Sequence, residues 1–356
     1  MLHLFGSPTN AFWADLSLTY ARGAYEALSP HHSFLNVLIL PDGSWRVGRD
    51  IAPGTLRETA SPFAPDEAVS RILSAAPDCA LPQMFCPAGM TDYRGMIEAL
   101  GIPIIGNTGA VMALAADKAK TRAIMQQAGI AVPRAQLLGH GDTEPPDLSR
   151  FAPPFIVKPA IADNSEGVSL VTLPEDLPAA LRGAFAVCER VLIEDYIWLG
   201  REVRCGVVEI DGRAVPLPLE EYNVDPVVRP IRTPTDKLDT SAPGDVKLMA
   251  KTKDAAWIVP ESDPLTQSVQ RVALDCHAAL GARDYSLFDF RIDRDGRPWF
   301  LEAGPYCSFS PDSVLAVMMD AAGTPLPHFF AQARDQATAR RTPPSPLISN
   351  TPERIP

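Results

Sequence analysis

Paired cysteines, a positive charge balance and long apolar runs are all absent from this sequence. Its six cysteines, at positions 79, 86, 188, 205, 276 and 307, lie far apart and form no Cys-x-x-Cys pair. That spacing argues against a metal knuckle and against a disulfide framework. Thiols that stay reduced are typical of a cytoplasmic protein, which is the location we expect.

Cationic residues are outnumbered, because 32 Lys and Arg face 43 Asp and Glu, for a net charge of −11. An acidic balance of this size argues against a nucleic-acid-binding face. No segment is apolar for long enough to span a bilayer. The start, MLHLFGSPTN, lacks the basic region and apolar stretch of a secretory signal. We therefore expect neither nucleic acid nor membrane as a partner.

Apolar residues and proline are abundant. Of the 356 residues, 46% are hydrophobic, which suits a globular protein of two or three domains with a real core. Many of the 36 prolines lie in loops and in the tail RRTPPSPLISNTPERIP. We predict that the tail, taken as residues 337–356, is disordered.

Strands alternate with helices through the first part of the chain. The helical stretches are AFWADLSLTYARGAYEAL and DYRGMIEALG, and the strands read LHLF, LNVLILP, DCALPQMF and IPIIG. Such alternation predicts a parallel sheet with crossover helices. We place this N-terminal α/β domain at residues 1–112.

The rest of the chain divides into two units of mixed α+β type. Residues 113–197 hold the helix AADKAKTRAIMQQAG, the strand–loop–strand unit PFIVKPAIADNSEGVSLV and the strand VLIEDYI. Residues 198–336 open with a hairpin that turns at Asp211-Gly212 and include a long helix, PLTQSVQRVALDCHAALG. Residues 223–260 show little periodicity, and a functional loop is one usual explanation of so long an irregular stretch.

Two carboxylates lie on the last predicted hairpin, FDFRIDRDGRPWFLEAG. Strand alternation places Leu287, Asp289 and Arg291 on one face, and Phe300 and Glu302 on one face of the return strand. If the strands pair, Asp289 and Glu302 converge. A cation between them would relieve their repulsion, and Mg²⁺ is the usual occupant of such a pair beside phosphates. The alternative is a surface hairpin with solvated acids.

Three lysines call for anionic partners. Lys158 lies inside the apolar strand FIVKP, where an unpaired ammonium is costly. Lys118 begins a helix, and Lys251 lies in the irregular segment KLMAKTKD. Phosphates would satisfy all three. The loop ADNSEG, which contains Ser165, could donate backbone N–H groups to phosphates, although an ordinary surface turn can have the same sequence.

A hinge between the two C-terminal units is the third candidate feature. Glu194 and Glu202 flank the segment YIWLG. The strand edge there could offer backbone groups to a purine, with Glu202 reaching the ribose hydroxyls. The alternative is that Glu202 forms a surface ion pair with Arg201 or Arg204.

In this order, the pieces resemble the D-alanine–D-alanine ligase branch of the ATP-grasp superfamily, over roughly residues 80–325. The matching pieces are the lead-in, the strand–glycine loop–strand, the hinge and the metal hairpin: IEALGIPIIGNTGAVMALAADKAKTRAIMQQAGIAVP, FIVKPAIADNSEGVSLV, VLIEDYIWLGREVRCGVV and FDFRIDRDGRPWFLEAG. The resemblance implies an ATP-grasp fold preceded by a parallel α/β (pre-ATP-grasp) domain.

The resemblance also implies site residues at the matching positions. Groups at the ATP phosphates would be Lys118, Lys158, Ser165, Lys251 and Arg291. Groups at the base and sugar would be Glu194, Tyr196, Ile197, Glu202 and Phe300. Asp289 and Glu302 would coordinate Mg²⁺.

The family chemistry would then apply to small amino-acid-like substrates. A carboxylate attacks the γ-phosphate of ATP, and an amine displaces phosphate from the resulting acyl phosphate to form an amide. Lysines and Mg²⁺ neutralise the charge that moves in the first step. The irregular segment 223–260 is a candidate lid that excludes water. Members are often homodimers through the N-terminal domain, so a homodimer is expected by analogy alone.

The departures from the family lie on the substrate side. Gly304 stands where the family has a metal-binding Asn, and Leu287 where it has an Arg that steadies the oxyanion. Cys86 replaces a His, and Thr252 replaces a lid Tyr. The segment GSPTNAFWAD shows no Glu equivalent to the one that grips the first D-alanine. We therefore expect a ligase of a specialised pathway rather than D-Ala–D-Ala synthesis, with intermolecular ligation and ring closure both open.

Residues after Glu302 would line the acceptor side: Tyr306, Cys307, Ser308, Ser310, Asp312 and Ser313. Cys307 is expected to be a small residue in a turn rather than a nucleophile. Asp312 could bind an acceptor ammonium or cap the helix SVLAVMMDAAG, which Pro311 and Ser313 also suit, and we favour the cap. Two alternatives to the ligase stay open. One is a nucleotide-binding homologue with little or no ligase activity, acting as a regulator or partner subunit. The other is a kinase.

Overall fold

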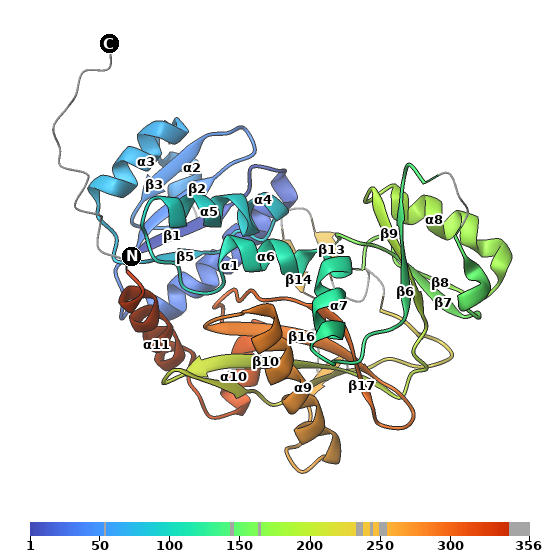
Figure 1. Ribbon diagram of the computed structural model, residues 1–356. Helices are drawn as coiled ribbons and strands as arrows, with labels where there is room; N and C mark the ends of the chain where they lie inside the picture. The colour runs from blue at the N-terminus through green and yellow to red at the C-terminus, as the bar shows by residue number, and fades with distance from the viewer. Residues whose placement is uncertain are drawn as a thin grey trace.

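The computed structural model contains three main sheets and describes residues 1–52, 55–142, 146–162, 165–232, 238–242, 245–248 and 255–341 (Figure 1). Each sheet falls in one of the three predicted ranges. The boundaries of these ranges stay a prediction. Within the described chain, no single helix is long and apolar enough to cross a membrane, although a bent pair near the end meets the test of length and composition.

The first sheet has five strands in the order β4-β3-β2-β1-β5. Its strands are β1 (Leu2–Gly6), β2 (Leu35–Ile39), β3 (Trp45–Gly48), β4 (Pro62–Phe63) and β5 (Ala80–Pro82). The parallel arrangement is confirmed for β2, β1 and β5, while β3 and β4 are antiparallel. The strand predicted in IPIIG is reduced to a single bridge between Ile104 and Ala80.

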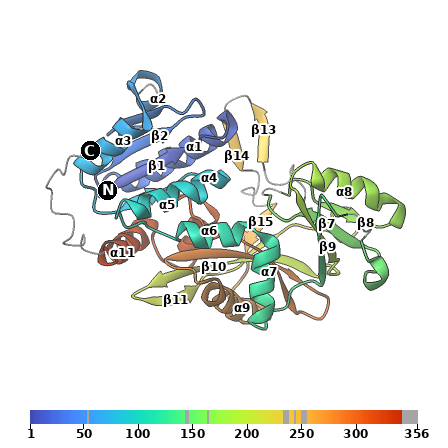
Figure 2. The same ribbon diagram turned by 45° about the horizontal axis from the view of Figure 1, so that its top comes forward.

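Helices pack on both sides of this sheet (Figure 2). They are α1 (Ala11–Leu28), α2 (Leu56–Thr59), α3 (Pro65–Ser74), α4 (Pro87–Met90) and α5 (Asp92–Ala99). Asn10 begins α1 by accepting a hydrogen bond from the Trp13 backbone N–H at 3.0 Å, which satisfies one of the free donors at the helix start. The buried apolar side chains of α1, including Leu18 and Ala21, then face the sheet.

Asp117 divides the helix predicted at residues 115–129 into α6 (Gly109–Ala116) and α7 (Lys118–Gln127). Its extended backbone ends α6, and its carboxylate accepts a hydrogen bond from the Lys120 backbone N–H at 3.1 Å. The cap directs Lys118 away from the axis of α6. Although α7 belongs to the range predicted as the small lobe, its buried Met125 packs in the core of the third sheet.

The small lobe is built on the second sheet, which has four antiparallel strands in the order β6-β9-β7-β8. They are β6 (Ala135–Gly139), β7 (Phe155–Pro159), β8 (Ser169–Val171) and β9 (Arg190–Asp195), joined by η1 (Leu148–Arg150), η2 (Pro174–Asp176) and α8 (Leu177–Phe185). Phe155, Val157 and Ile193 pack under α8. The opposite face of β7 and β9 is left for polar side chains.

The third sheet runs β15-β12-β10-β16-β17, with β11 paired to β10. The strands are β10 (Arg201–Ile210), β11 (Arg213–Pro216), β12 (Glu220–Tyr222), β15 (Ala256–Ile258), β16 (Tyr285–Ile292) and β17 (Pro298–Ala303). The hairpin turn at Asp211-Gly212 is confirmed, with left-handed φ values of 51° and 71°. Helix α9 (Pro264–Leu280) covers the face that carries Phe288 and Phe290.

The other face of this sheet serves two purposes along its length. At one end, Leu287 packs with Phe309 and with helices α10 (Val314–Ala321) and α11 (Leu326–Ala339). Further along β16, the same face turns polar at Asp289. Helix α11 continues to Ala339, and Arg340 forms two hydrogen bonds with Asp284 at 2.7 and 2.8 Å. The predicted disorder is therefore wrong for residues 337–341, while 342–356 lie outside the described residues.

Part of the segment predicted to be irregular contains a two-stranded antiparallel ribbon, β13 (Leu238–Ala242) and β14 (Asp245–Leu248). Figure 2 shows this ribbon beside α1, between the N-terminal domain and the small lobe. The prediction of low regularity at 223–260 is thus wrong for these strands and for β15.

Candidate active site

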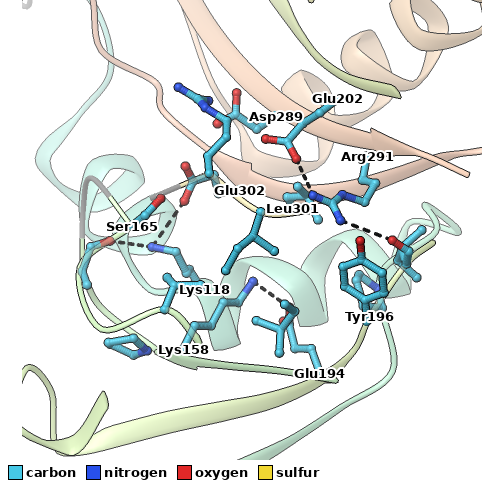
Figure 3. A pocket seen from close by; sticks show the side chains of 18 of the residues that line it. Lys118, Lys158, Ser165, Glu194, Tyr196, Glu202, Asp289, Arg291, Leu301 and Glu302 are labelled. Atoms are coloured by element: carbon cyan, nitrogen blue, oxygen red, sulfur yellow. Dashed lines mark hydrogen bonds and ion pairs between the residues drawn. The ribbon is translucent and has the colours of Figure 1, made fainter. Parts of the chain in front are cut away.

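A pocket lies where the polar faces of the second and third sheets meet (Figure 3). Its walls come from α7, β7, β9, β10, β16 and β17 and from the segments that join them. Most of the predicted site residues line it: Lys118, Lys158, Ser165, Glu194, Tyr196, Ile197, Glu202, Asp289, Arg291 and Glu302. Lys251 and Thr252 lie outside the described residues.

Lys158 is buried on β7, and its Nζ lies 2.7 Å from Oε2 of Glu194 on the adjacent strand β9. Arg122 of α7 approaches the other carboxylate oxygen, with Nε 3.6 Å from Oε1. The predicted need of Lys158 for an anionic partner is confirmed, and the structure supplies a carboxylate. A buried ion pair of this kind is costly to break by removing one partner.

Lys118 connects a loop of the small lobe to the third sheet. Its Nζ donates a hydrogen bond to the Ala162 carbonyl at 2.5 Å and lies 3.4 Å from Oε2 of Glu302. Ser165, in the same loop, has a left-handed φ of 61°, and Gly167 follows with 69°. Residues 163 and 164 lie outside the described part of the loop. The fold therefore places a lysine and a tight turn opposite the carboxylate pair.

Glu202 and Arg291 are direct partners across β10 and β16, with Arg291 Nη2 2.7 Å from Glu202 Oε2. Arg291 also donates to the carbonyl groups of Ile197 at 3.3 Å and Pro230 at 2.9 Å, and its guanidinium lies 5.2 Å from the centre of the Tyr196 ring. The alternative pairing of Glu202 with Arg201 or Arg204 is wrong. Arg291 instead fixes the hinge segment against the third sheet.

Four charged residues form one row across neighbouring strands: Glu220 of β12, Arg204 of β10, Asp289 of β16 and Glu302 of β17. Arg204 binds both oxygens of Asp289, one through Nε and the other through Nη2 at 3.2 Å. The pairing of Arg204 with Asp289 was not predicted from the sequence. The role could have been found from strand alternation, because residues 202 and 204 lie on the same face of the strand.

A β-bulge between the two strands of the metal hairpin overturns one predicted site residue. Asp289 pairs with Glu302, yet the neighbouring Phe290 pairs with Phe300, so Leu301 is the extra residue. Phe300 is 1% exposed and packs on Phe290 in the core, whereas Leu301 lines the pocket. The predictions that Phe300 shares a face with Glu302 and contacts the nucleotide are therefore wrong.

The carboxylate pair suits a hard cation. Burial raises the pKa of Asp289, Arg204 lowers it, and the nearby charge of Glu302 raises it further. Two oxygen donors under mutual repulsion fit Mg²⁺, which commonly takes one or two carboxylates and completes its shell with phosphates and water. The described residues contain no group of three or more His, Cys, Asp or Glu side chains that could hold a metal.

The residues that follow Glu302 form the predicted acceptor side of the site. A Cβ at Gly304 would lie 3.4 to 3.8 Å from the ring and hydroxyl of Tyr306, an ordinary contact distance. The Cys307 thiol is buried, and burial raises its pKa to about 12, which agrees with the predicted structural role and not with a nucleophile. Ser313, not Asp312, caps α10 by accepting a hydrogen bond from the Ala316 backbone N–H, so that prediction is wrong.

Comparison with known proteins agrees with this geometry. Residues 124–332 match the family described as D-ala D-ala ligase C-terminus. The D-alanine–D-alanine ligase of Mycolicibacterium smegmatis is 29% identical over 333 residues, covering 85% of this chain and 86% of the relative. That of Corynebacterium urealyticum is 33% identical over 237 residues, covering 65% of this chain and 61% of the relative.

Solved structures show the same fold at low identity. The D-alanine–D-alanine ligase of Coxiella burnetii has a TM-score of 0.72 and 18% identity, with 96% of this chain and 95% of that chain covered. The Bacillus anthracis enzyme complexed with ATP has a TM-score of 0.69 and 19% identity, with 96% and 97% covered. The chain therefore belongs to the D-alanine–D-alanine ligase family of ATP-dependent carbon–nitrogen ligases, which use ATP and Mg²⁺, and has its ATP-grasp fold.

Proposed function

We propose that this chain joins the carboxyl group of one small amino-acid-like substrate to the amine of another, through an acyl phosphate made from ATP. The observation that carries the proposal is the meeting of the carboxylate pair Asp289 and Glu302 with Lys118, Lys158 and the Ser165 turn in one pocket. These groups come from both lobes, so the pocket collects the charges that a nucleotide triphosphate and its metal require.

The base and sugar of ATP would lie at the hinge. Glu194 and the backbone of Tyr196 and Ile197 line that end of the pocket, and Glu202 stands beside them. Glu202 is held by Arg291, which orients one carboxylate oxygen and leaves the other for the ribose hydroxyls. The carboxylate that would accept hydrogen bonds from the ribose is thus held in place before the nucleotide binds, which lowers the entropy cost of binding.

The phosphates would lie between the lysines and the carboxylate pair. Lys118 and Lys158 approach from the small lobe, and the left-handed turn at Ser165 can aim backbone N–H groups at oxygen anions. Bound between Asp289 and Glu302, Mg²⁺ would supply charge neutralisation at these phosphates. Lys251, from the segment after β14, is proposed to reach the phosphates as well.

We further propose that the substrates are not two D-alanines. The relatives from Mycolicibacterium smegmatis and Corynebacterium urealyticum are D-alanine–D-alanine ligases, at identities of 29% and 33%. Against this, Leu287 is buried among apolar side chains, Gly304 offers no side-chain oxygen, and the buried Cys86 starts helix α4. Groups that would contact the two amino-acid substrates therefore differ from those of the family. The described charged residues that are expected at the nucleotide all line the pocket.

The test is a substrate screen with ATP, Mg²⁺ and pooled D- and L-amino acids and analogues, with D-alanine alone as one arm. Phosphate release and a new mass equal to two components minus water are expected for a pair other than D-alanine. Glu302→Ala and Lys158→Ala should each lower turnover at least about 100-fold, because each removes a charge at the phosphates. A dialanine product at comparable rate would refute the substrate proposal. ATP binding without turnover across broad panels would favour a non-catalytic homologue.

A further inference from the structure

Of the described residues that line the pocket, four carry cationic side chains, and three of these already contact carboxylates. Figure 3 draws these contacts, which join Lys118 to Glu302, Lys158 to Glu194 and Arg291 to Glu202. The fourth cation is Arg232, which follows β12. Among the described residues, Arg232 forms no salt bridge. A pocket cation without a carboxylate partner is a ready receptor for an anion.

Arg232 is nevertheless held in place. Its guanidinium lies over the ring of Tyr222, 3.5 Å from the centroid. Tyr222 is 4% exposed on β12, and Arg204 lies 5.1 Å from the same ring. A guanidinium stacked on an aromatic ring loses little freedom and keeps the N–H groups of its edge for planar oxygen anions. The contact with Tyr222 therefore positions Arg232 without satisfying its hydrogen-bond donors.

The position of Arg232 is beside the carboxylate pair. Arg232 lines the same pocket as Asp289 and Glu302. The guanidinium groups of Arg232 and Arg204 lie over the same Tyr222 ring, which places Arg232 next to the residue that binds Asp289. Arg204 is occupied because it binds both oxygens of Asp289. Among the described residues, Arg232 is thus a pocket cation without a carboxylate partner that can meet an incoming anion.

We propose that Arg232 contacts the γ-phosphate of ATP and neutralises charge on that group while it is transferred. The inference rests on the proposed function. In the transfer, the bond between the γ-phosphorus and the ADP oxygen breaks, and a bond forms to an oxygen of the substrate carboxylate. Arg232 keeps its protons throughout and serves as an electrostatic donor. Leu287, two residues before Asp289 on β16, carries no charge that could share this role.

The experiment compares ATP and ADP binding with excess Mg²⁺ by titration calorimetry, without amino-acid substrates. Arg232→Met should weaken ATP binding about tenfold, as expected for a lost charged hydrogen bond, and leave ADP binding unchanged. Arg232→Lys should recover part of the loss, and Tyr222→Leu should show a weaker version of it. The matched control is Arg71→Met, since Arg71 lies over Phe63 at 4.1 Å in the N-terminal domain, far from the pocket.

The comparison distinguishes a contact with the γ-phosphate from a contact with another phosphate or with the substrate carboxylate. Equal weakening of ATP and ADP would overturn the assignment, because the contact would then lie on an α- or β-phosphate. Unchanged nucleotide affinity with a raised KM for the carboxylate substrate would also overturn it, by placing Arg232 on that carboxylate. Failure of the unmodified protein to bind ATP would refute the proposed function itself. With substrates identified, kcat of Arg232→Met should fall about 100-fold or more.

Discussion

Gly304 is the residue at which the acceptor side of the carboxylate pair can be altered with least disturbance. Its φ lies outside the left-handed region, and a Cβ there would meet the Tyr306 ring at 3.4 Å or more. A side chain is therefore tolerated by the backbone and by its neighbours. Glu302 stands two residues earlier on the strand, so residue 304 can present an oxygen on the same side.

Gly304→Asn is expected to add a metal ligand or a partner for a metal-bound water. Binding of Mn²⁺, used as a probe for Mg²⁺, should tighten about fivefold in the presence of ATP, the size of one net hydrogen bond. Electron paramagnetic resonance of free Mn²⁺ measures this directly. Gly304→Ala fills the same space without an oxygen. If Asn binds Mn²⁺ no more tightly than Ala does, residue 304 is not beside the metal.

At the scale of elements, the break between α6 and α7 fixes where Lys118 enters the pocket. Asp117 makes the break by capping α7 and by its ion pair with Arg190 at 2.6 Å. Burial by itself would raise the pKa of Asp117, but the hydrogen bonds from Arg190 and the Lys120 backbone lower it on balance. A carboxyl group with a lowered folded-state pKa stabilises the fold above its unfolded pKa of about 3.8 and loses that effect as pH falls toward the folded value.

Asp117→Asn should therefore reduce the free energy of unfolding by about 1 to 2 kcal/mol at pH 7, since the charge is lost while a capping oxygen remains. The difference between the two proteins should be smaller at pH 3 than at pH 7, because below its unfolded pKa of about 3.8 the carboxyl group gains protons in the unfolded chain first. Urea unfolding at both pH values measures it. A difference that stays constant with pH would mean that the charge of Asp117 does not stabilise the fold.

The hairpin of β16 and β17 shows which side-chain positions can be predicted from strand alternation and which cannot. Alternation correctly placed Asp289 opposite Phe288 and Phe290, because a fully buried strand separates two environments by its pleat. The same rule failed for Phe300, because one extra residue inverts the alternation. The sequence held a clue, since pairing acid with acid and ring with ring requires a bulge at Leu301. In the same way, a local capping residue outweighed the continuous helical pattern at Asp117.

At the scale of the molecule, the resemblance supplied the order of the lobes, whereas the contacts between them depend on side chains far apart in sequence. Neither the Arg204–Asp289 pair nor the anchoring of Arg340 on Asp284 has a local pattern. Residue pairs of this kind are set by tertiary packing. For this reason, most of the residues that line the pocket could be predicted by position, whereas the partners of their charged groups could not.

Asn107 joins the N-terminal domain to the loop that follows the carboxylate pair. Its Nδ2 donates to the carbonyls of Tyr285 at 2.7 Å and Pro305 at 2.9 Å, and its Oδ1 accepts from the Arg283 backbone N–H at 2.8 Å. The side chain is fully buried, so water cannot replace these bonds. Asn107 therefore holds Pro305, next to Gly304, against the N-terminal domain.

Asn107→Ala should lower the free energy of unfolding by about 2 to 4 kcal/mol, because two buried backbone carbonyls and one partly buried N–H lose their partner. Asn107→Asp should be at least as destabilising, since it places an oxygen where two carbonyls need a donor. Denaturant unfolding of both variants separates donation from packing. If Asp were milder than Ala, filling the space would matter more than the hydrogen bonds. Because one of these hydrogen bonds holds Pro305 next to Gly304, the turnover of the folded variant should also fall. Its affinity for ATP should stay unchanged.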